Sequence, residues 1–211
     1  MKIQVFVLIG LLLCSCDKHK DSPLPLLPLN VGNSWKYEYT LYYGETPYSQ
    51  IDEIEIKYSN TIDGITGYSF EEYSEGSPVT LMNNDAEGNC NAYFFDNGSL
   101  IQSTLVYKKD AKKGDHWEYK VVVFPDEDDS EYNIEQYSMT CVAVDTLITT
   151  PAGNFNCIGF SYDYGEAGEG EKSDMTMVNY LSENVGIVKT VYYNQGIGLY
   201  SEGVLIDYHI K

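Results

Sequence analysis

The side chains that most often perform catalysis are sparse in this sequence of 211 residues. The three histidines are His19, His116 and His209, and no His-x-x-x-His, Cys-x-x-Cys or Gly-x-Ser-x-Gly motif occurs. A serine or cysteine nucleophile would have to recruit His116 or His209 as its base. The simpler interpretation is that His116 fills a turn and His209 points outward from the last strand. We therefore predict no catalytic residue and no cofactor.

Carboxylates are abundant, with 32 Asp and Glu residues, so a pair suited to glycoside hydrolysis is compatible with the composition. The densest acidic group is Asp126–Glu131, whose alternating oxygen ligands could bind Ca²⁺. It lacks the central glycine and the terminal glutamate of a calcium-binding loop. We interpret it as a solvated hairpin tip and Gly165–Glu171 as a similar acidic loop, and we predict no metal site.

Tyrosine is the most distinctive residue, with twenty copies and none before Tyr37. A tyrosine ring combines a flat apolar face with a hydroxyl group, which suits sugar stacking or a semi-polar ligand cavity. Tyrosine is also a good strand former on a sheet with one solvated face. The pair Tyr192-Tyr193 places aromatic rings on both faces of a strand, so both interpretations stay open.

Five cysteines are present, and the three distal ones are Cys90, Cys141 and Cys157. They allow one disulfide in any of three pairings, or three buried free thiols. If residues 151–154 close a hairpin, Cys157 falls opposite about Ile148, and Cys141 is not its direct neighbour.

The N-terminus carries an export signal. Lys2 precedes the run Val5–Leu13, which is apolar apart from one glycine and too short to span a bilayer. Leu13, Ser15 and Cys16 then resemble the lipobox that lipoprotein signal peptidase reads. We predict cleavage before Cys16 and acylation of its thiol, with Cys14 as the alternative acceptor and a plain secretory signal as the alternative leader.

The chain therefore divides into a lipoprotein signal peptide (1–15), an acylated flexible spacer (16–28) and one domain (29–211). The spacer is polar and then rich in proline, a composition that cannot bury a core. The formal net charge is −19 and all thirteen basic residues are lysine. This composition argues against nucleic acid as a partner and against adhesion to anionic lipid. The expected membrane contact is the covalent lipid itself.

Period-two alternation of apolar and polar residues predicts half-buried strands, near 35–41, 53–58, 117–123 and 204–210. Turn-forming sequences separate them, notably Asp63-Gly64 and Asn97-Gly98. No segment shows a convincing helical period. Roughly ten short strands predict an all-β fold, a single antiparallel curved sheet that forms a half-barrel or barrel.

An internal repeat reads Gly-Asn/Asp-x-Trp-x-Tyr. It covers Gly32–Tyr37 and Gly114–Tyr119 and contains both tryptophans of the chain. Glycine supplies a bend, Asn or Asp closes it, and tryptophan anchors the strand that follows. We therefore expect two related halves of one sheet system, with Trp35 and Trp117 buried at comparable strand starts.

Three short motifs carry a family resemblance: Gly32–Trp35, Pro151–Phe155 and Asn184–Val188. They are similar to the G-x-x-W, P-A-G-x-F and G-V-G-x-V signatures of uncharacterised lipoproteins from Bacteroidetes-type bacteria. The resemblance implies an antiparallel half-barrel or barrel of the lipoprotein-carrier or lipocalin-like kind, and it supplies no catalytic residues.

The leading functional hypothesis is a non-enzymatic, palmitate-bearing lipoprotein of the outer membrane that binds an unidentified ligand or partner. The ligand could be an apolar small molecule. The alternatives are a glycan-binding surface module with tyrosine platforms and, third, a carboxylate-dependent glycoside hydrolase.

Overall fold

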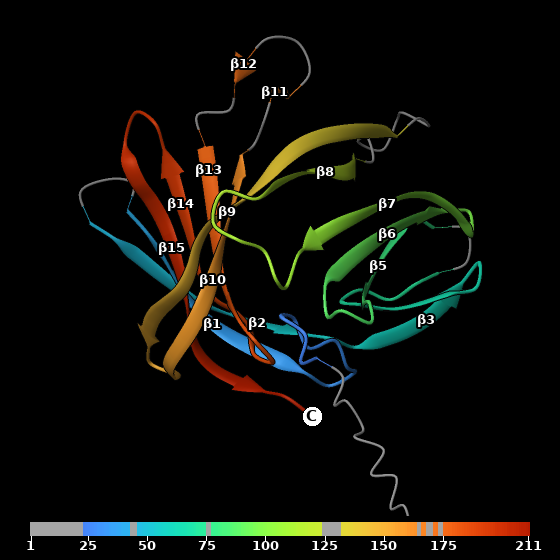
Figure 1. Ribbon diagram of the computed structural model, residues 1–211, viewed down its shortest axis with the longest axis horizontal. Coiled ribbons are helices and arrows are strands. Elements are labelled where there is room, and N and C mark those ends of the chain that lie inside the picture. The colour runs from blue at the N-terminus through green and yellow to red at the C-terminus, as the bar shows by residue number, and fades with distance from the viewer. Residues whose placement is uncertain are drawn as a thin grey trace, which may run out of the picture.

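A computed structural model describes residues 23–42, 46–74, 77–123, 132–163, 166–167, 171–172 and 175–211. All regular elements of these residues are β-strands, and they form antiparallel sheets, which confirms the predicted all-β fold (Figure 1). The strands divide between two main sheets, where the sequence predicted a single curved one. The two sheets do not close into a continuous barrel.

The larger sheet has eight strands in the order β2-β1-β15-β14-β13-β10-β9-β8. Their bounds, in the same order, are Tyr48–Glu55, Ser34–Leu41, Gly198–His209, Gly186–Asn194, Met175–Ser182, Gly153–Asp163, Asn133–Thr150 and His116–Val123.

The smaller sheet has five strands in the order β3-β4-β5-β6-β7. Their bounds are Tyr58–Ile62, Ile65–Ser69, Val79–Asn84, Cys90–Asp96 and Ser99–Tyr107, and a separate hairpin joins β11 (Glu166–Ala167) to β12 (Glu171–Lys172). Figure 1 shows this sheet beside the larger one, with β2 leading into β3.

Local turn chemistry sets two hairpins of the smaller sheet. Asp63 and Gly64 join β3 to β4 with φ of 49° and 76°, and Asn97 and Gly98 join β6 to β7 with φ of 48° and 74°. Positive φ at both central residues defines the type I′ turn, whose twist matches that of paired strands. Asn, Asp and Gly tolerate this conformation best, which is why the sequence predicted both turns correctly.

The internal repeat is a structural repeat. Gly32 N donates to Ile56 O at 2.8 Å, and Ile56 N donates to Asn33 O at 2.9 Å. In the second copy Gly114 N donates to Cys141 O at 2.8 Å, and Cys141 N donates to the Asp115 carbonyl at 2.8 Å. Each motif thus begins a strand and bonds in the same way to the residue just beyond that strand's hairpin ladder, Ile56 after Glu55 and Cys141 after Thr140.

The equivalence extends over the whole domain. After the motif, each half runs through the same succession of antiparallel neighbours, so the halves correspond as β1 to β8, β2 and β3 to β9, β4 to β10, β5 to β13, β6 to β14 and β7 to β15. The halves meet at two seams. At one, β15 forms a full ladder with β1. At the other, β7 meets β8 through side chains: Trp117 Nε1 donates to Leu105 O at 3.0 Å, and Lys120 N donates to Thr104 Oγ1 at 3.1 Å.

Both tryptophans stand second in their strands, as the repeat predicts, but their burial differs. Trp35 is 3% exposed and its Nε1 donates to Val185 O at 2.5 Å. Trp117 is only half-buried, against the expectation of full burial. It lies at the open seam, where no strand of the described residues continues the sheet beyond β8.

Packing begins earlier than the predicted domain start at Leu29. Leu26 and Leu27 are 4% and 7% exposed and belong to the main core. Asn184 N donates to Pro25 O at 2.7 Å, which holds this segment against the turn before β14. The last residues of the predicted spacer therefore belong to the folded domain, because their leucines bury apolar surface despite the prolines. The signal peptide and Cys16 lie outside the described residues.

Candidate functional site

The predicted catalytic candidates are not gathered. His116 is the first residue of β8, not part of a turn, and His209 is the last residue of β15; both are exposed. His19 and the acidic group Asp126–Glu131 lie outside the described residues. Among the residues that are described, no three His, Cys, Asp or Glu side chains are arranged to hold a metal ion.

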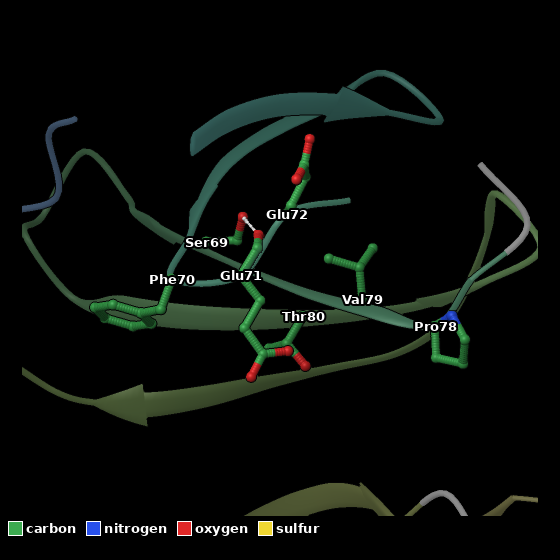
Figure 2. A pocket seen from close by; sticks show the side chains of 7 residues that line it. All are labelled: Ser69, Phe70, Glu71, Glu72, Pro78, Val79 and Thr80. Carbon is green, nitrogen blue, oxygen red and sulfur yellow. Dashed lines mark hydrogen bonds between the residues drawn. The ribbon is translucent and has the colours of Figure 1, made fainter. Parts of the chain in front are cut away.

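A cavity of about 310 Å³ lies where the chain leaves β4 and before it enters β5 (Figure 2). Its acidic side chains are Glu71 and Glu72, both exposed. Figure 2 shows their carboxylates pointing away from each other, with that of Glu71 directed toward Thr80. A glycosidase needs two carboxylates that face one bond, and these two do not.

A second cavity of about 360 Å³ lies between the halves, and its lining includes Leu26, Lys109, Cys157, Leu181 and Glu183. Lys109 Nζ contacts Glu183 Oε1 at 2.5 Å, so its only lysine is neutralised by a carboxylate. Burial raises the pKa of the Cys157 thiol to about 11. At neutral pH this thiol is protonated, and a protonated thiol is a poor nucleophile.

The three distal cysteines are free and buried. Cys157 lies opposite Thr146, two residues from the expected Ile148, because Pro151 and Ala152 alone close the hairpin and Thr150 already pairs with Gly153. Cys141 lies opposite Phe160 and is not a direct neighbour of Cys157, as predicted. Burial raises the pKa of Cys90 to about 12. These thiols are packing residues.

Tyrosines gather on the inner face of the larger sheet. Side chains of paired residues share a face, so the register defines a row with one member per strand. From β1 to β8 this row is Leu41, Ser201, Tyr192, Met177, Tyr162, Met139 and Trp117. Further tyrosines lie two residues along from members of the row. We call Tyr39, Tyr119, Tyr137, Tyr162 and Tyr192 the tyrosine face.

Ring contacts join three members of the tyrosine face. Tyr162 lies 5.4 Å from Tyr119, edge to face, and 5.1 Å from Tyr137, measured between ring centroids. Tyr162 is 8% exposed, and the other four are half-buried. Burial, with Tyr192 and Asp52 nearby, raises the pKa of Tyr39 to about 12. The Tyr39 hydroxyl is therefore protonated at physiological pH. The face presents apolar rings with hydroxyl groups, and the hydroxyl of Tyr137 donates to the Glu135 carboxylate.

A buried polar chain supports the tyrosine face from beneath. Tyr107, at the end of β7, packs its ring 5.4 Å from that of Phe160. Its hydroxyl accepts a hydrogen bond from Asn179 Nδ2 at 3.0 Å, and Thr190 Oγ1 donates to Asn179 Oδ1 at 2.7 Å. The smaller sheet thus covers the inner face of the larger sheet as far as Tyr107. The tyrosine face lies next to the part that the smaller sheet covers.

Sequence reasoning identified tyrosine as the residue type of interest but not which tyrosines would gather. Among the described residues the exposed tyrosines are Tyr48, Tyr132, Tyr193 and Tyr208. They stand on the separate strands β2, β14 and β15 or just before β9. The available signal was the alternation of Tyr37 and Tyr39 after Trp35, which places them on the tryptophan's face. Assigning the others required the strand register.

The described part of the chain contains no helix long and apolar enough to cross a bilayer. Residues 141–205, from within β9 to within β15, match the protein family described as DUF3108-like. No curated protein matches the sequence.

Two solved structures are similar to the chain. One is a presumed exported protein with a YmcC-like fold from Bacteroides fragilis, at 15% identity and a TM-score of 0.41, covering 88% of this chain and 99% of that one. The other is a presumed lipoprotein from Parabacteroides distasonis, at 15% identity and a TM-score of 0.41, covering 90% of this chain and 100% of that one.

Proposed function

We propose that this chain is a lipid-anchored lipoprotein of the outer membrane, without enzymatic activity, whose tyrosine face binds a mainly apolar ligand with a few hydrogen-bonding groups. One observation carries the proposal: five tyrosines from five strands converge on one inner, half-buried face of the larger sheet. Ligand sites are typically concave, mainly apolar and aromatic, with a few well-placed polar groups.

The same observation favours an apolar ligand over a glycan. Glycan platforms need flat rings exposed in a row, whereas the most exposed tyrosines of the described residues are scattered. Within the tyrosine face the Tyr162 ring is edge-on to that of Tyr119 and tilted to that of Tyr137, and all five rings are at least half-buried. Such a surface suits a ligand that is itself desolvated on binding.

The anchor rests on the sequence. Cys16 follows a signal-like apolar run and is preceded by Leu13 and Ser15. Mass spectrometry of the N-terminal peptide from membrane-purified protein should show a diacylglyceryl, N-acylated cysteine at Cys16. An unmodified N-terminus at any other residue would exclude the anchor, and fractionation of the envelope would test the outer-membrane location.

The absence of catalysis is supported by both cavities. Lys109 is paired with Glu183, the Cys157 thiol is protonated, and the carboxylates of Glu71 and Glu72 diverge. Glycosidase, esterase and peptidase substrates should give no turnover with the purified protein, and turnover abolished by a single carboxylate substitution would contradict this.

The ligand site is tested with N-phenyl-1-naphthylamine, a neutral apolar probe whose fluorescence rises on burial. It should bind the Cys16→Ser form of the mature chain, and Tyr192→Ala should weaken binding by about tenfold, which is about 1.4 kcal/mol. Tyr192→Phe should have a smaller effect because the ring is kept.

Tyr193→Ala is the matched control, since Tyr193 lies on the same strand but points to the opposite face and is 45% exposed. It should leave probe binding unchanged. Equal effects of Tyr192→Ala and Tyr193→Ala would exclude the tyrosine face. Oligosaccharide binding that depends on Tyr193 would support the glycan alternative instead.

A further inference from the structure

The strand β2 has an open edge. It pairs with β1 on one side, and no described strand pairs with its other side. All eight of its residues are exposed, including Tyr48 at 63% and Ile51 at 59%. An exposed edge strand offers a row of unpaired backbone N–H and C=O groups to another extended segment.

The internal repeat shows how the equivalent edge is filled. Ile56 corresponds to Cys141 through the same backbone hydrogen bonds, so β2 corresponds to the first part of β9. There β9 has two partners: β8 on one side and the end of β10, up to Asp163, on the other. In the second half the edge is therefore covered by the chain itself.

In the first half no described strand takes that place. β4 corresponds to β10 but ends at Ser69, whose hydroxyl donates to Glu71 O at 2.8 Å and closes a bend. The following residues turn away, and the cavity of about 310 Å³ lies between Ser69–Glu72 and Pro78–Thr80 (Figure 2). At the equivalent place in the second half, β10 and β13 are paired without interruption.

The direction of the free backbone groups follows from strand alternation. Ile56 N–H and C=O both point toward the β1 side, since they bond to Asn33 O and Gly32 N. Successive residues of a strand point these groups to opposite sides. The N–H and C=O groups of Ser49, Ile51, Glu53 and Glu55 therefore point toward the open edge.

The charge of the residues near the open edge of β2 indicates which kind of segment could pair with it. β2 carries Asp52, Glu53 and Glu55 and no basic residue. Glu71 and Glu72 follow the end of β4, the place from which the repeat would continue the covering strand. No ion pair among the described residues involves these five carboxylates. A second copy paired through β2 would bring acidic strands together, and like charges across a strand pair are unfavourable.

We propose that the open edge of β2 accepts an extended, lysine- or arginine-bearing segment of a partner protein as an added antiparallel strand. The segment takes the position on β2 that the end of β10 takes on β9. Backbone hydrogen bonds provide the affinity, and the five carboxylates select a basic sequence. This site is independent of the tyrosine face.

The probe is a peptide of about ten residues in which lysine alternates with threonine and valine. It should bind the Cys16→Ser mature chain in calorimetry, with an affinity that falls as salt rises. The same peptide with glutamate in place of lysine should not bind. Glu53→Lys combined with Glu55→Lys should weaken the lysine peptide and admit the glutamate peptide.

Ile51→Pro tests the backbone contact, because it removes an N–H that points away from β1, and proline is tolerated at such an edge position. Binding should weaken by about tenfold. Ile51→Thr keeps the N–H and should bind normally. N-methylation of alternate residues of the peptide removes peptide N–H groups that would donate to β2. It therefore tests the backbone contact even where the Ile51→Pro variant fails to fold. Binding unaffected by both changes, or a dimer through β2 in place of peptide binding, would overturn the proposal.

Discussion

At the scale of single residues, the interior is held by a few buried polar side chains with complete partners. Asn179 is 5% exposed and links Tyr107 of the smaller sheet to Thr190 of the larger one. Burial also raises the pKa of Tyr107, so its hydroxyl stays protonated throughout the neutral range. Polar groups in such a place contribute specificity because each is costly to leave unpaired.

Asn179→Ala should therefore destabilise the protein by ~1–3 kcal/mol, because it leaves the Tyr107 and Thr190 hydroxyls buried without their partner. Urea unfolding followed by far-UV circular dichroism measures the loss. Thr190→Val and the double variant complete a thermodynamic cycle. The two losses should be coupled, and strictly additive losses would show that Asn179 and Thr190 do not act as one network.

At the scale of elements, what the sequence predicted well was local. The Asp63-Gly64 and Asn97-Gly98 turns follow from backbone preferences of two adjacent residues, and the strand starts at Trp35 and Trp117 follow from a repeated motif. What it predicted less well depends on distant partners. The break of the expected strand at Ile56 and Lys57 reflects a move from one sheet to the other, and no local pattern encodes that change of partner.

The candidate site divides in the same way. Alternation along one strand predicts that Tyr37 and Tyr39 share a face with Trp35. That the Tyr162 ring contacts those of both Tyr119 and Tyr137 depends on the pairing of β8, β9 and β10 and on a bulge near Gly159. Register over that distance is fixed by the packed core and not by any one segment.

The two motif tryptophans should contribute differently to the free energy of unfolding, even though they occupy equivalent positions in the fold. Trp35→Ala should cost ~3–5 kcal/mol of unfolding free energy, since its ring is fully buried and its Nε1 hydrogen bond to Val185 O is lost. Trp117→Ala should cost less, because its half-buried ring removes less apolar area from water. Thermal and urea unfolding of both variants measures the difference, and an equal or larger loss at Trp117 would contradict this account of the open seam.

At the scale of the whole molecule, the two halves share one core. The main apolar cluster draws Trp35, Phe94 and Tyr107 from the first half and Phe160 and Leu205 from the second. A smaller cluster of Ile62, Val79, Leu81 and Phe95 lies within the first half alone. Because the repeat closes on itself at the β1–β15 ladder, the equivalence of the halves does not make them independent.

The halves should therefore fold only together. In the isolated first half, cut between Asp110 and Ala111, β1 would keep only β2 as a neighbour, and Tyr37 Oη would lose its 2.8 Å hydrogen bond to Ile187 O. The smaller cluster that remains has four fully internal apolar side chains, too few to offset the chain entropy of about 90 residues. Each fragment alone should give the circular dichroism of an unfolded chain, the mixed fragments should regain the β-sheet spectrum, and the intact chain should unfold in one transition. A fragment that folds by itself, or two separate transitions in the intact chain, would contradict this prediction. Either result would show that the β1–β15 ladder and the Tyr107–Asn179 contact do not make the halves depend on each other.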